Sequence, residues 1–288
     1  MEKPKKPIAS SLAMVLAVVA IAVSVAALHR STLNTNQTQS ESVLTKIQHT
    51  GKMEVCYGVY PPAVIKDAKT GALSGHDIDA LKLIAQRIGA TAEFHEQTFG
   101  NMAAALQSGT CDVTTAFFAQ IPRAAVVAFT QPLYFIGESA LIRKGDTRFN
   151  TLDDIDKPGI KVAVANGESG YNYVKEHFKN AQLDVIDVES SDLSRFLLEV
   201  TAGRADVGIA DSETIRLFAA QHPETQDLFA NNPFNINPTN YAVRQGDTDF
   251  LNFINTSVQY LETTGEFQAL EQKYGAHWLH EVKQYQPL

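Results

Sequence analysis

The chain has 288 residues, of which 44% are hydrophobic and 19% are charged. This balance is typical of a globular protein with one large domain or two smaller ones. Its formal net charge is −8, whereas nucleic-acid affinity comes mainly from Lys and Arg residues that neutralise phosphates. The charge therefore argues against nucleic acid as a partner.

The N-terminus has the features of a membrane-directed segment. Three lysines lie within residues 3–6, and residues 8–28 contain no charged side chain. That length suits the roughly 20 apolar residues that span a bilayer, whereas the apolar part of a signal peptide has about 7–15. We expect residues 1–30 to be an uncleaved anchor with a cytoplasmic N-terminus, and a signal peptide cut at the small residues 24–27 is the alternative. The largely polar residues 31–43 are expected to form a flexible tether.

The rest of the chain alternates predicted strands and helices. The first strand is expected over residues 53–59, and Asp77 is expected to be the N-cap of an amphipathic helix. Further strands are expected at residues 92–95, 112–117, 160–165, 183–188 and 206–210. Such alternation predicts an α/β protein whose parallel sheets have helices on both faces.

An internal repeat divides this body into two lobes. Residues 99–113 and 193–207 each place apolar residues at i, i+3, i+4 and i+7, followed by a Gly and an Asp-Val pair. The pattern predicts a helix, a glycine C-cap and a strand. We therefore expect two Rossmann-like lobes with a hinge and an interlobe cleft: residues 44–139 and 238–288 form lobe 1, and residues 140–237 form lobe 2.

Loops at the carboxyl ends of the strands would line such a cleft. Arg123 would come from lobe 1, and Asp211 and the strand-to-helix turn at Ser169 from lobe 2. A guanidinium binds a carboxylate through two parallel hydrogen bonds, a carboxylate accepts an ammonium, and a helix N-terminus favours an anion. The set predicts a zwitterionic ligand. Crossing strands near Ala140–Ile142 and Pro238–Ala242 would form the hinge.

Several short motifs occur in an order that is typical of one family. They are Gly75-His76-Asp77-Ile78-Asp79, residues 106–113 (LQSGTCDV), Pro122-Arg123, residues 129–134 (FTQPLY), Gly203-Arg204-Ala205-Asp206 and Asp211. With them the chain, over residues 44–278, resembles the bacterial periplasmic solute-binding proteins of the polar amino-acid type. The resemblance implies the type II periplasmic-binding fold and a periplasmic, monomeric protein without a cofactor. Such a protein captures an amino acid or another small carboxylate for an ABC-type importer, whose membrane permease is a possible partner.

The resemblance also implies roles for single polar residues. Arg123 matches the arginine that holds the ligand α-carboxylate, Asp211 the acid that receives the α-amino group, and Ser169 the hydroxyl beside the carboxylate. Each position has a structural alternative: a surface helix residue for Arg123, and a helix N-cap for Asp211 and Ser169.

Aromatic and polar side chains complete the implied pocket. Tyr60 and Phe99 match aromatic walls that sandwich the ligand side chain, and Thr115 matches a position of polar contacts. Phe99 also begins an apolar helix face, so core packing is the alternative for it. The chain departs from the family at Phe118 and Gln120, where Ser or Thr is usual, and this change of the wall favours an apolar or aromatic ligand.

The two cysteines, Cys56 and Cys111, both lie at expected buried strand positions. We expect them to be free, because buried thiols commonly pack as small hydrophobic groups and strand geometry seldom meets the spacing of a disulfide. A disulfide is the alternative, since an exported protein meets an oxidising compartment.

The sequence contains no complete motif of a nucleophilic, metal or nucleotide site. Tyr171 replaces the second glycine of a G-x-S-x-G motif around Ser169. No H-E-x-x-H, P-loop or G-x-G-x-x-G motif occurs. We therefore expect no bound metal or cofactor.

One enzyme remains as an alternative. Residues 148–159 and 222–224 resemble cyclohexadienyl dehydratase, which shares this fold and needs a general acid in its cleft. Thr214 occupies the position of that enzyme's glutamate, and Glu213 is one residue away, which on a helix points about 100° aside. We therefore favour solute binding over dehydration of prephenate or arogenate.

Overall fold

The computed structural model describes residues 42–188 and 194–281. The predicted anchor or signal peptide and residues 31–41 of the predicted tether lie outside these residues and stay predictions. None of the described helices is long and apolar enough to cross a membrane. Val43, which we had placed in the tether, is the buried first residue of a helix.

The first sheet has five strands in the order β4-β1-β5-β14-β7. These are β4 (Thr91–Glu96), β1 (Lys52–Tyr57), β5 (Val113–Thr114), β14 (Ala242–Arg244) and β7 (Val127–Phe129). β1 lies parallel to β4 and β5, and β14 lies antiparallel to β5 and β7. A separate small hairpin joins β2 (Ile65–Lys66) and β3 (Leu73–Ser74).

Helices cover both faces of the first sheet because successive side chains of a strand point to opposite faces. Met53 and Val55 of β1 contribute to one core cluster, and Cys56 contributes to another. The first cluster also takes side chains from α2 (Val43–Thr50), α3 (His76–Arg87), α10 (Thr248–Thr263) and α11 (Glu266–Tyr274), and the second from α4 (Met102–Ser108). Trp278 packs onto the first cluster, with its ring stacked 3.7 Å from that of Tyr134.

The second sheet has seven strands, six of them in the order β10-β9-β11-β8-β13-β6, with β12 paired to β8. They are β10 (Gln182–Ile186), β9 (Lys161–Ala165), β11 (Val207–Asp211), β8 (Tyr134–Arg143), β13 (Phe234–Asn240), β6 (Phe117–Phe118) and β12 (Thr225–Asp227). Side chains of α7 (Ser169–His177) pack on one face. Those of η1 (Arg195–Leu197), α8 (Leu198–Thr201) and α9 (Ser212–Gln221) pack on the other. The remaining short helices are α5 (Ile121–Ala124) and α6 (Leu152–Ile155).

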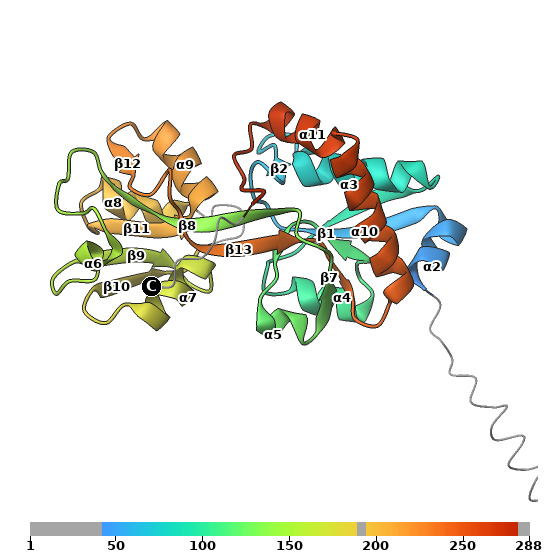
Figure 1. Cartoon of the computed structure of the whole chain (residues 1–288), viewed down its shortest axis with the longest axis horizontal. Helices are drawn as coiled ribbons and strands as arrows, with labels where there is room; N and C mark the ends of the chain where they lie inside the picture. Colours follow the sequence, from blue (N-terminus) through green and yellow to red (C-terminus); the bar gives the residue numbers. More distant parts are fainter. Residues whose placement is uncertain (1–41, 189–193, 282–288) are drawn as a thin grey trace, which may run out of the picture. The chain divides into compact units, whose positions relative to one another are not determined.

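The two strands that connect the sheets are β8 and β13, and Figure 1 shows both running between the two halves of the body. The expected first crossing at Ala140–Ile142 is wrong by several residues, because this segment pairs with Val207–Ile209 inside the second sheet. The part of β8 that runs between the two halves of the body lies nearer its start, where Tyr134 and Phe135 pair with β13.

The predicted repeat is present in its main features. In the first copy α4 ends at Gly109, whose φ of 75° is the left-handed conformation of a glycine C-cap. In the second copy Gly203 has a φ of 70°. Its helix differs from the expectation, since the described part consists of a 3-10 turn followed by the four residues of α8.

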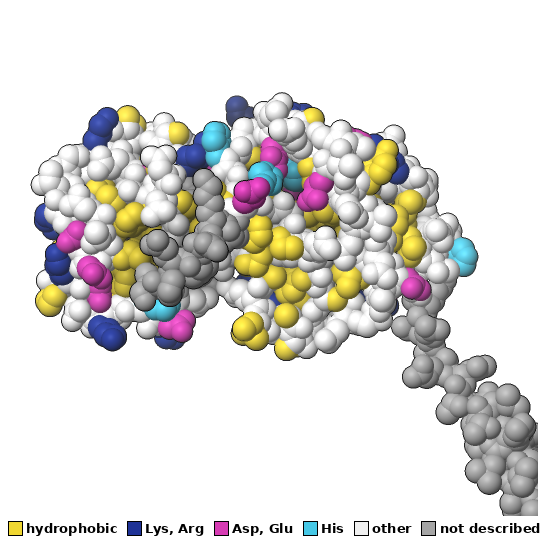
Figure 2. Space-filling view, in the orientation of Figure 1, with side chains coloured by type: hydrophobic (Ala, Val, Ile, Leu, Met, Phe, Trp, Pro, Cys, Tyr) yellow, Lys and Arg dark blue, Asp and Glu magenta, His cyan; other side chains and the backbone are white. Residues whose placement is uncertain are grey.

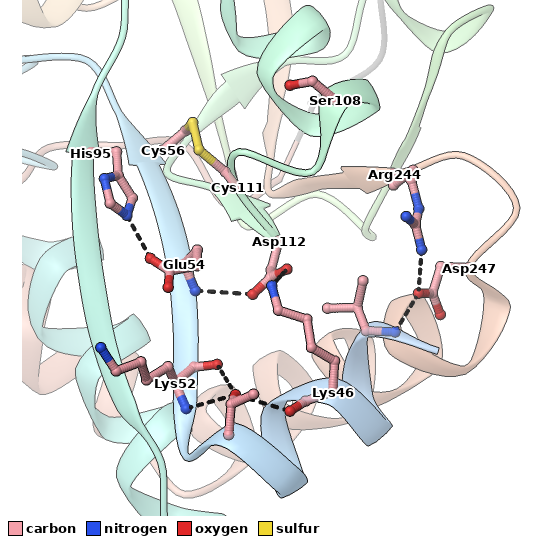
Figure 3. Close-up of polar contacts among 12 residues, drawn as sticks. Lys46, Lys52, Glu54, Cys56, His95, Ser108, Cys111, Asp112, Arg244 and Asp247 are labelled. Atoms are coloured by element: carbon pink, nitrogen blue, oxygen red, sulfur yellow. Dashed lines mark hydrogen bonds and ion pairs between the residues drawn. A yellow bond between two sulfur atoms is a disulfide. The ribbon is translucent and has the colours of Figure 1, made fainter. Parts of the chain in front are cut away.

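The expectation of free cysteines is wrong, because Cys56 and Cys111 form a disulfide with Cα atoms 5.6 Å apart. Pairing of β1 with β5 places Cys56 opposite Thr114, so Cys111 approaches from the turn before β5. Figure 3 shows Asp112 next to this bridge, accepting hydrogen bonds from the Glu54 amide (3.0 Å) and the Lys46 ammonium (2.8 Å). The disulfide and the carboxylate together join β1 to the turn between α4 and β5.

Candidate ligand-binding site

Loops that follow strands of both sheets surround one pocket of about 310 Å³. Six of the seven predicted site residues line it: Tyr60, Phe99, Phe118, Arg123, Ser169 and Asp211. Thr115 is not among its lining residues, since its side chain is 1% exposed and the neighbouring Ala116 faces the pocket instead. The volume is at the small end of the range for ligand pockets.

The aromatic wall of the pocket consists of Tyr60, Phe99 and Phe118. All three pack against core clusters of the first sheet, although Phe118 itself belongs to β6 at the edge of the second sheet. Tyr60 follows β1 and pairs with Val64 in a short bridge. The ring of Phe99 lies over Gly58, where an added Cβ would come within 2.8 Å of the ring Cζ. Glycine at position 58 therefore lets this ring lie against the end of β1.

Arg123 belongs to the short helix α5 at the same side of the pocket. Its guanidinium donates a hydrogen bond to the Phe118 carbonyl (3.2 Å), and Cζ lies 4.1 Å from the centre of the Phe117 ring. Burial lowers the pKa of Arg123, and the nearby Glu168 partly opposes this shift. Arginine nevertheless stays charged in proteins, so the pocket contains a fixed cation.

Asp211 ends β11 and faces the pocket from the side of the second sheet. Its carboxylate accepts hydrogen bonds from the Thr214 amide (2.9 Å) and the Tyr60 hydroxyl (2.6 Å). Asp211 is therefore the N-cap of α9, as one reading predicted, and it also contacts a residue that follows β1.

The N-terminus of α7 also borders the pocket. Ser169 is its first residue and is 8% exposed. Glu168 precedes it at the N-cap position without capping the helix through its side chain. Burial raises the pKa of Glu168 to about 7, and Asp211 adds to the rise while Arg123 opposes it.

A second buried acid, Glu138, lies behind this side of the pocket. It faces Asp211 across the β8–β11 pair and is fully buried. Neither of its carboxyl oxygens has a hydrogen-bond partner among the described residues. The Ser169 hydroxyl lies near enough to lower the pKa in part, but burial dominates and raises it to about 8. Glu138 is therefore protonated at neutral pH.

Gly170 permits this close arrangement. A Cβ at position 170 would come within 2.9 Å of the Ile209 carbonyl oxygen and 3.1 Å of Glu138 Oε2. Only a residue without a side chain lets the first turn of α7 approach β11 so closely.

Glu213, the acid nearest to the position that the enzyme alternative requires, is not a lining residue of the pocket. Thr214 lines the pocket, whereas Glu213 is 2% exposed and is paired with Arg216. Glu213, one residue before Thr214, is therefore buried and ion-paired and does not lie at the pocket surface.

Motif reasoning missed two acids, Glu168, which lines the pocket, and Glu138, which is buried behind its wall. Glu168 lies in the turn that was singled out for Ser169, where only the hydroxyl and the helix N-terminus were considered. Glu138 is a lone acid in the otherwise uncharged run of residues 133–142, and that isolation was the available signal. Its burial depends on pairing with β11, which the local sequence does not specify.

Comparison with known proteins agrees with this fold. The family model of the bacterial extracellular solute-binding proteins, family 3, matches residues 54–277. The L-cystine-binding protein TcyJ of Escherichia coli is 25% identical over 240 residues, covering 81% of this chain and 86% of the relative. Cyclohexadienyl dehydratase of Pseudomonas aeruginosa is 24% identical over 242 residues, covering 83% and 87%. A solved ABC-transporter binding component from Wolinella succinogenes, complexed with lysine, has a TM-score of 0.72 and 25% identity, covering 79% of this chain and 97% of that one.

Proposed function

Because the chain belongs to family 3 of the bacterial extracellular solute-binding proteins, we propose that it captures an amino acid outside the cytoplasmic membrane. It would pass this ligand to an ABC-type permease. The family establishes an extracytoplasmic solute-binding protein. The amino acid as ligand, the permease and the residues that bind are parts of the proposal.

One observation carries the proposal: Arg123 and Asp211 line the same small pocket from different parts of the fold. Arg123 lies in α5, which leads into β7 of the first sheet, whereas Asp211 ends β11 of the second sheet. The Arg123 guanidinium would bind the ligand carboxylate, and Asp211 would accept the ammonium group. A ligand that joins both groups favours the closed arrangement, because its affinity for that arrangement is higher than for an open one. Amino acids carry both charged ends on one carbon atom.

The same geometry supports the proposed division into lobes. The first sheet and its helices would form lobe 1, residues 44–139 and 238–288, and most of the second sheet would form lobe 2, residues 140–237. β8 and β13 would act as the hinge, near Tyr134–Gly137 and Asn237–Thr239. We further propose that residues 1–30 retain the protein at the inner membrane, with release after cleavage as the alternative.

Calorimetric titration with a panel of amino acids tests the function directly. We expect at least one to bind the wild type. Asp211→Asn keeps an N-cap residue but removes the charge, so binding of amino acids should weaken by roughly 30-fold or more. Ligands that lack an amino group should be spared. Failure of every amino acid to bind the wild type would contradict the proposal.

A second candidate function rests on Glu168. A pocket carboxyl with a pKa of about 7 is suited to general acid catalysis near neutral pH, and cyclohexadienyl dehydratase is a relative. Incubation of the purified protein with prephenate or arogenate would reveal turnover, and a Glu168→Gln variant without that turnover would identify the acid. Binding remains our first proposal, because Thr214 replaces the glutamate that the enzyme resemblance requires.

A further inference from the structure

Among the described residues, more acidic than basic side chains line the pocket. Among the described residues that line it, the charged ones are Arg123, Glu168 and Asp211. The pair Arg123 and Asp211 balances a zwitterionic amino acid, whose carboxylate and ammonium also balance each other. Glu168 is then left without a counter-charge, and Glu138 behind the wall adds no cation.

We propose that Glu168 makes this pocket selective for amino acids that carry a second positive charge, on a guanidinium or amine side chain. This inference rests on the proposed function and narrows its ligand class. Burying an ionised carboxylate is costly unless it is paired. A cationic side chain would supply that pair, whereas an uncharged side chain of the same shape would leave Glu168 uncompensated.

The contacts of the three charged groups support this assignment. The Asp211 carboxylate already accepts hydrogen bonds from Tyr60 and Thr214, and Arg123 donates to the Phe118 carbonyl. The Glu168 side chain forms no hydrogen bond or ion pair with any residue that the structure describes, although it faces the pocket and is only partly exposed. Of the three, it is the one that still lacks a partner.

The pocket walls suit a cation as well. Tyr60, Phe99, Phe118 and Phe196 all line the pocket, and aromatic faces attract guanidinium and ammonium groups. The aromatic substitution at Phe118, read from the sequence as a sign of an apolar ligand, is therefore equally compatible with a cationic side chain between rings. The carboxylate of Glu168 favours a cationic ligand side chain over an apolar one, because an apolar side chain would leave Glu168 unpaired.

A competing role for Glu168 is that of a protonated donor to the ligand carboxylate. The two roles predict opposite responses to pH. The groups that face Glu168 are Arg123 and Asp211 at the pocket and Glu138 behind it. Because the pKa of Glu168 lies near 7, a preference for cationic ligands should be larger at pH 8 than at pH 6. A protonated donor would instead bind all amino acids more tightly at pH 6.

The test compares pairs of ligands that differ in charge but little in shape. Arginine with citrulline, and lysine with norleucine, are titrated into the wild type at pH 6 and pH 8. We expect the cationic member of each pair to bind at least tenfold more tightly at pH 8. Glu168→Gln should reduce that preference to threefold or less, whereas Asp211→Asn should weaken both members of a pair alike.

Glu176→Gln is the matched control, because Glu176 is an exposed residue of the same helix α7, and it should leave the preference unchanged. A wild type that binds citrulline as tightly as arginine, or a Glu168→Gln variant that keeps the full preference, overturns the inference and leaves the proposed function intact. A wild type that binds no amino acid overturns both.

Discussion

The two sides of the pocket are built from different chemistry. One side packs on the core of the first sheet and supplies the aromatic wall, Tyr60, Phe99 and Phe118, together with the cation Arg123 of α5. The side of the second sheet supplies what we call the acidic wall: Glu168, Ser169 and Asp211 at the surface, with Glu138 behind them. The aromatic wall offers flat surface and one fixed charge, whereas the acidic wall offers carboxyl groups and a helix N-terminus.

Because of this difference, neither side alone has all the groups that the proposed binding of an amino acid requires. Arg123 and the aromatic wall could hold a carboxylate and a side chain, but the described lining residues on this side include no carboxylate for the ammonium group. The acidic wall could hold the ammonium group, but its described lining residues include no cation for the ligand carboxylate. The Tyr60–Asp211 hydrogen bond of 2.6 Å joins the two walls at the point where their properties are complementary.

The largest effect is expected from neutralising the buried acid of the acidic wall. The pKa of Glu138 is about 8 in the folded protein and about 4.5 when the chain unfolds, so wild-type stability should fall as the pH rises from about 4.5 to 8. One pKa unit corresponds to about 1.4 kcal/mol, so the loss over this shift should be on the order of 5 kcal/mol. Glu138→Gln cannot ionise and should not show this loss.

Urea unfolding of both proteins between pH 5 and pH 9 measures the difference directly. Taking the difference between the two proteins removes contributions that they share, including that of Glu168. If the stability of wild type and of Glu138→Gln changed with pH in the same way, Glu138 would ionise as easily in the folded protein as in the unfolded chain. That result would contradict the burial of Glu138.

The next effect concerns the only cation among the described lining residues. Arg123→Ala should weaken amino-acid binding by about 2–5 kcal/mol, or roughly 30-fold or more, because it leaves the ligand carboxylate unpaired. The guanidinium contacts the Phe118 carbonyl and the Phe117 ring, so the free energy of unfolding should change little. Arg204→Ala is the control, since Arg204 is exposed and pairs with Glu199 at the surface. Equal affinities of Arg123→Ala and wild type would place the site elsewhere.

The smallest effect tests the placement of the aromatic wall. Gly58→Ala would push its methyl group against the Phe99 ring, which can move because it is the far end of a side chain. We expect ligand affinity to fall about three- to tenfold and the unfolding free energy to change by less than about 1 kcal/mol. In Gly100→Ala the new methyl group meets no atom within 4 Å. If calorimetry gives both variants the same affinity, the position of the Phe99 ring does not matter for binding.

Local patterns were sufficient for much of the site. Arg123, Ser169 and Asp211, which line the pocket, were predicted because each lies at or after the end of an apolar run in the sequence. Loops at the carboxyl ends of strands border the ligand site in open α/β sheets. Tyr60 and Phe99 came from the family resemblance. Thr115 failed because neighbouring residues of an extended chain point to opposite sides, and the register turned Ala116 toward the pocket.

The sequence by itself determined the α/β class, the glycine-capped repeat and the charged pair, because strand alternation, helix periodicity and turn residues act over a few neighbouring positions. Only the tertiary structure decided that Cys56 meets Cys111, where β8 leaves the first half of the body, and that Glu138 is buried without a partner. Each of these depends on which distant strands pair and in what register. The assembled fold also raises the pKa of Glu138 and of Glu168, because burial is a property of the whole structure and not of the single residues.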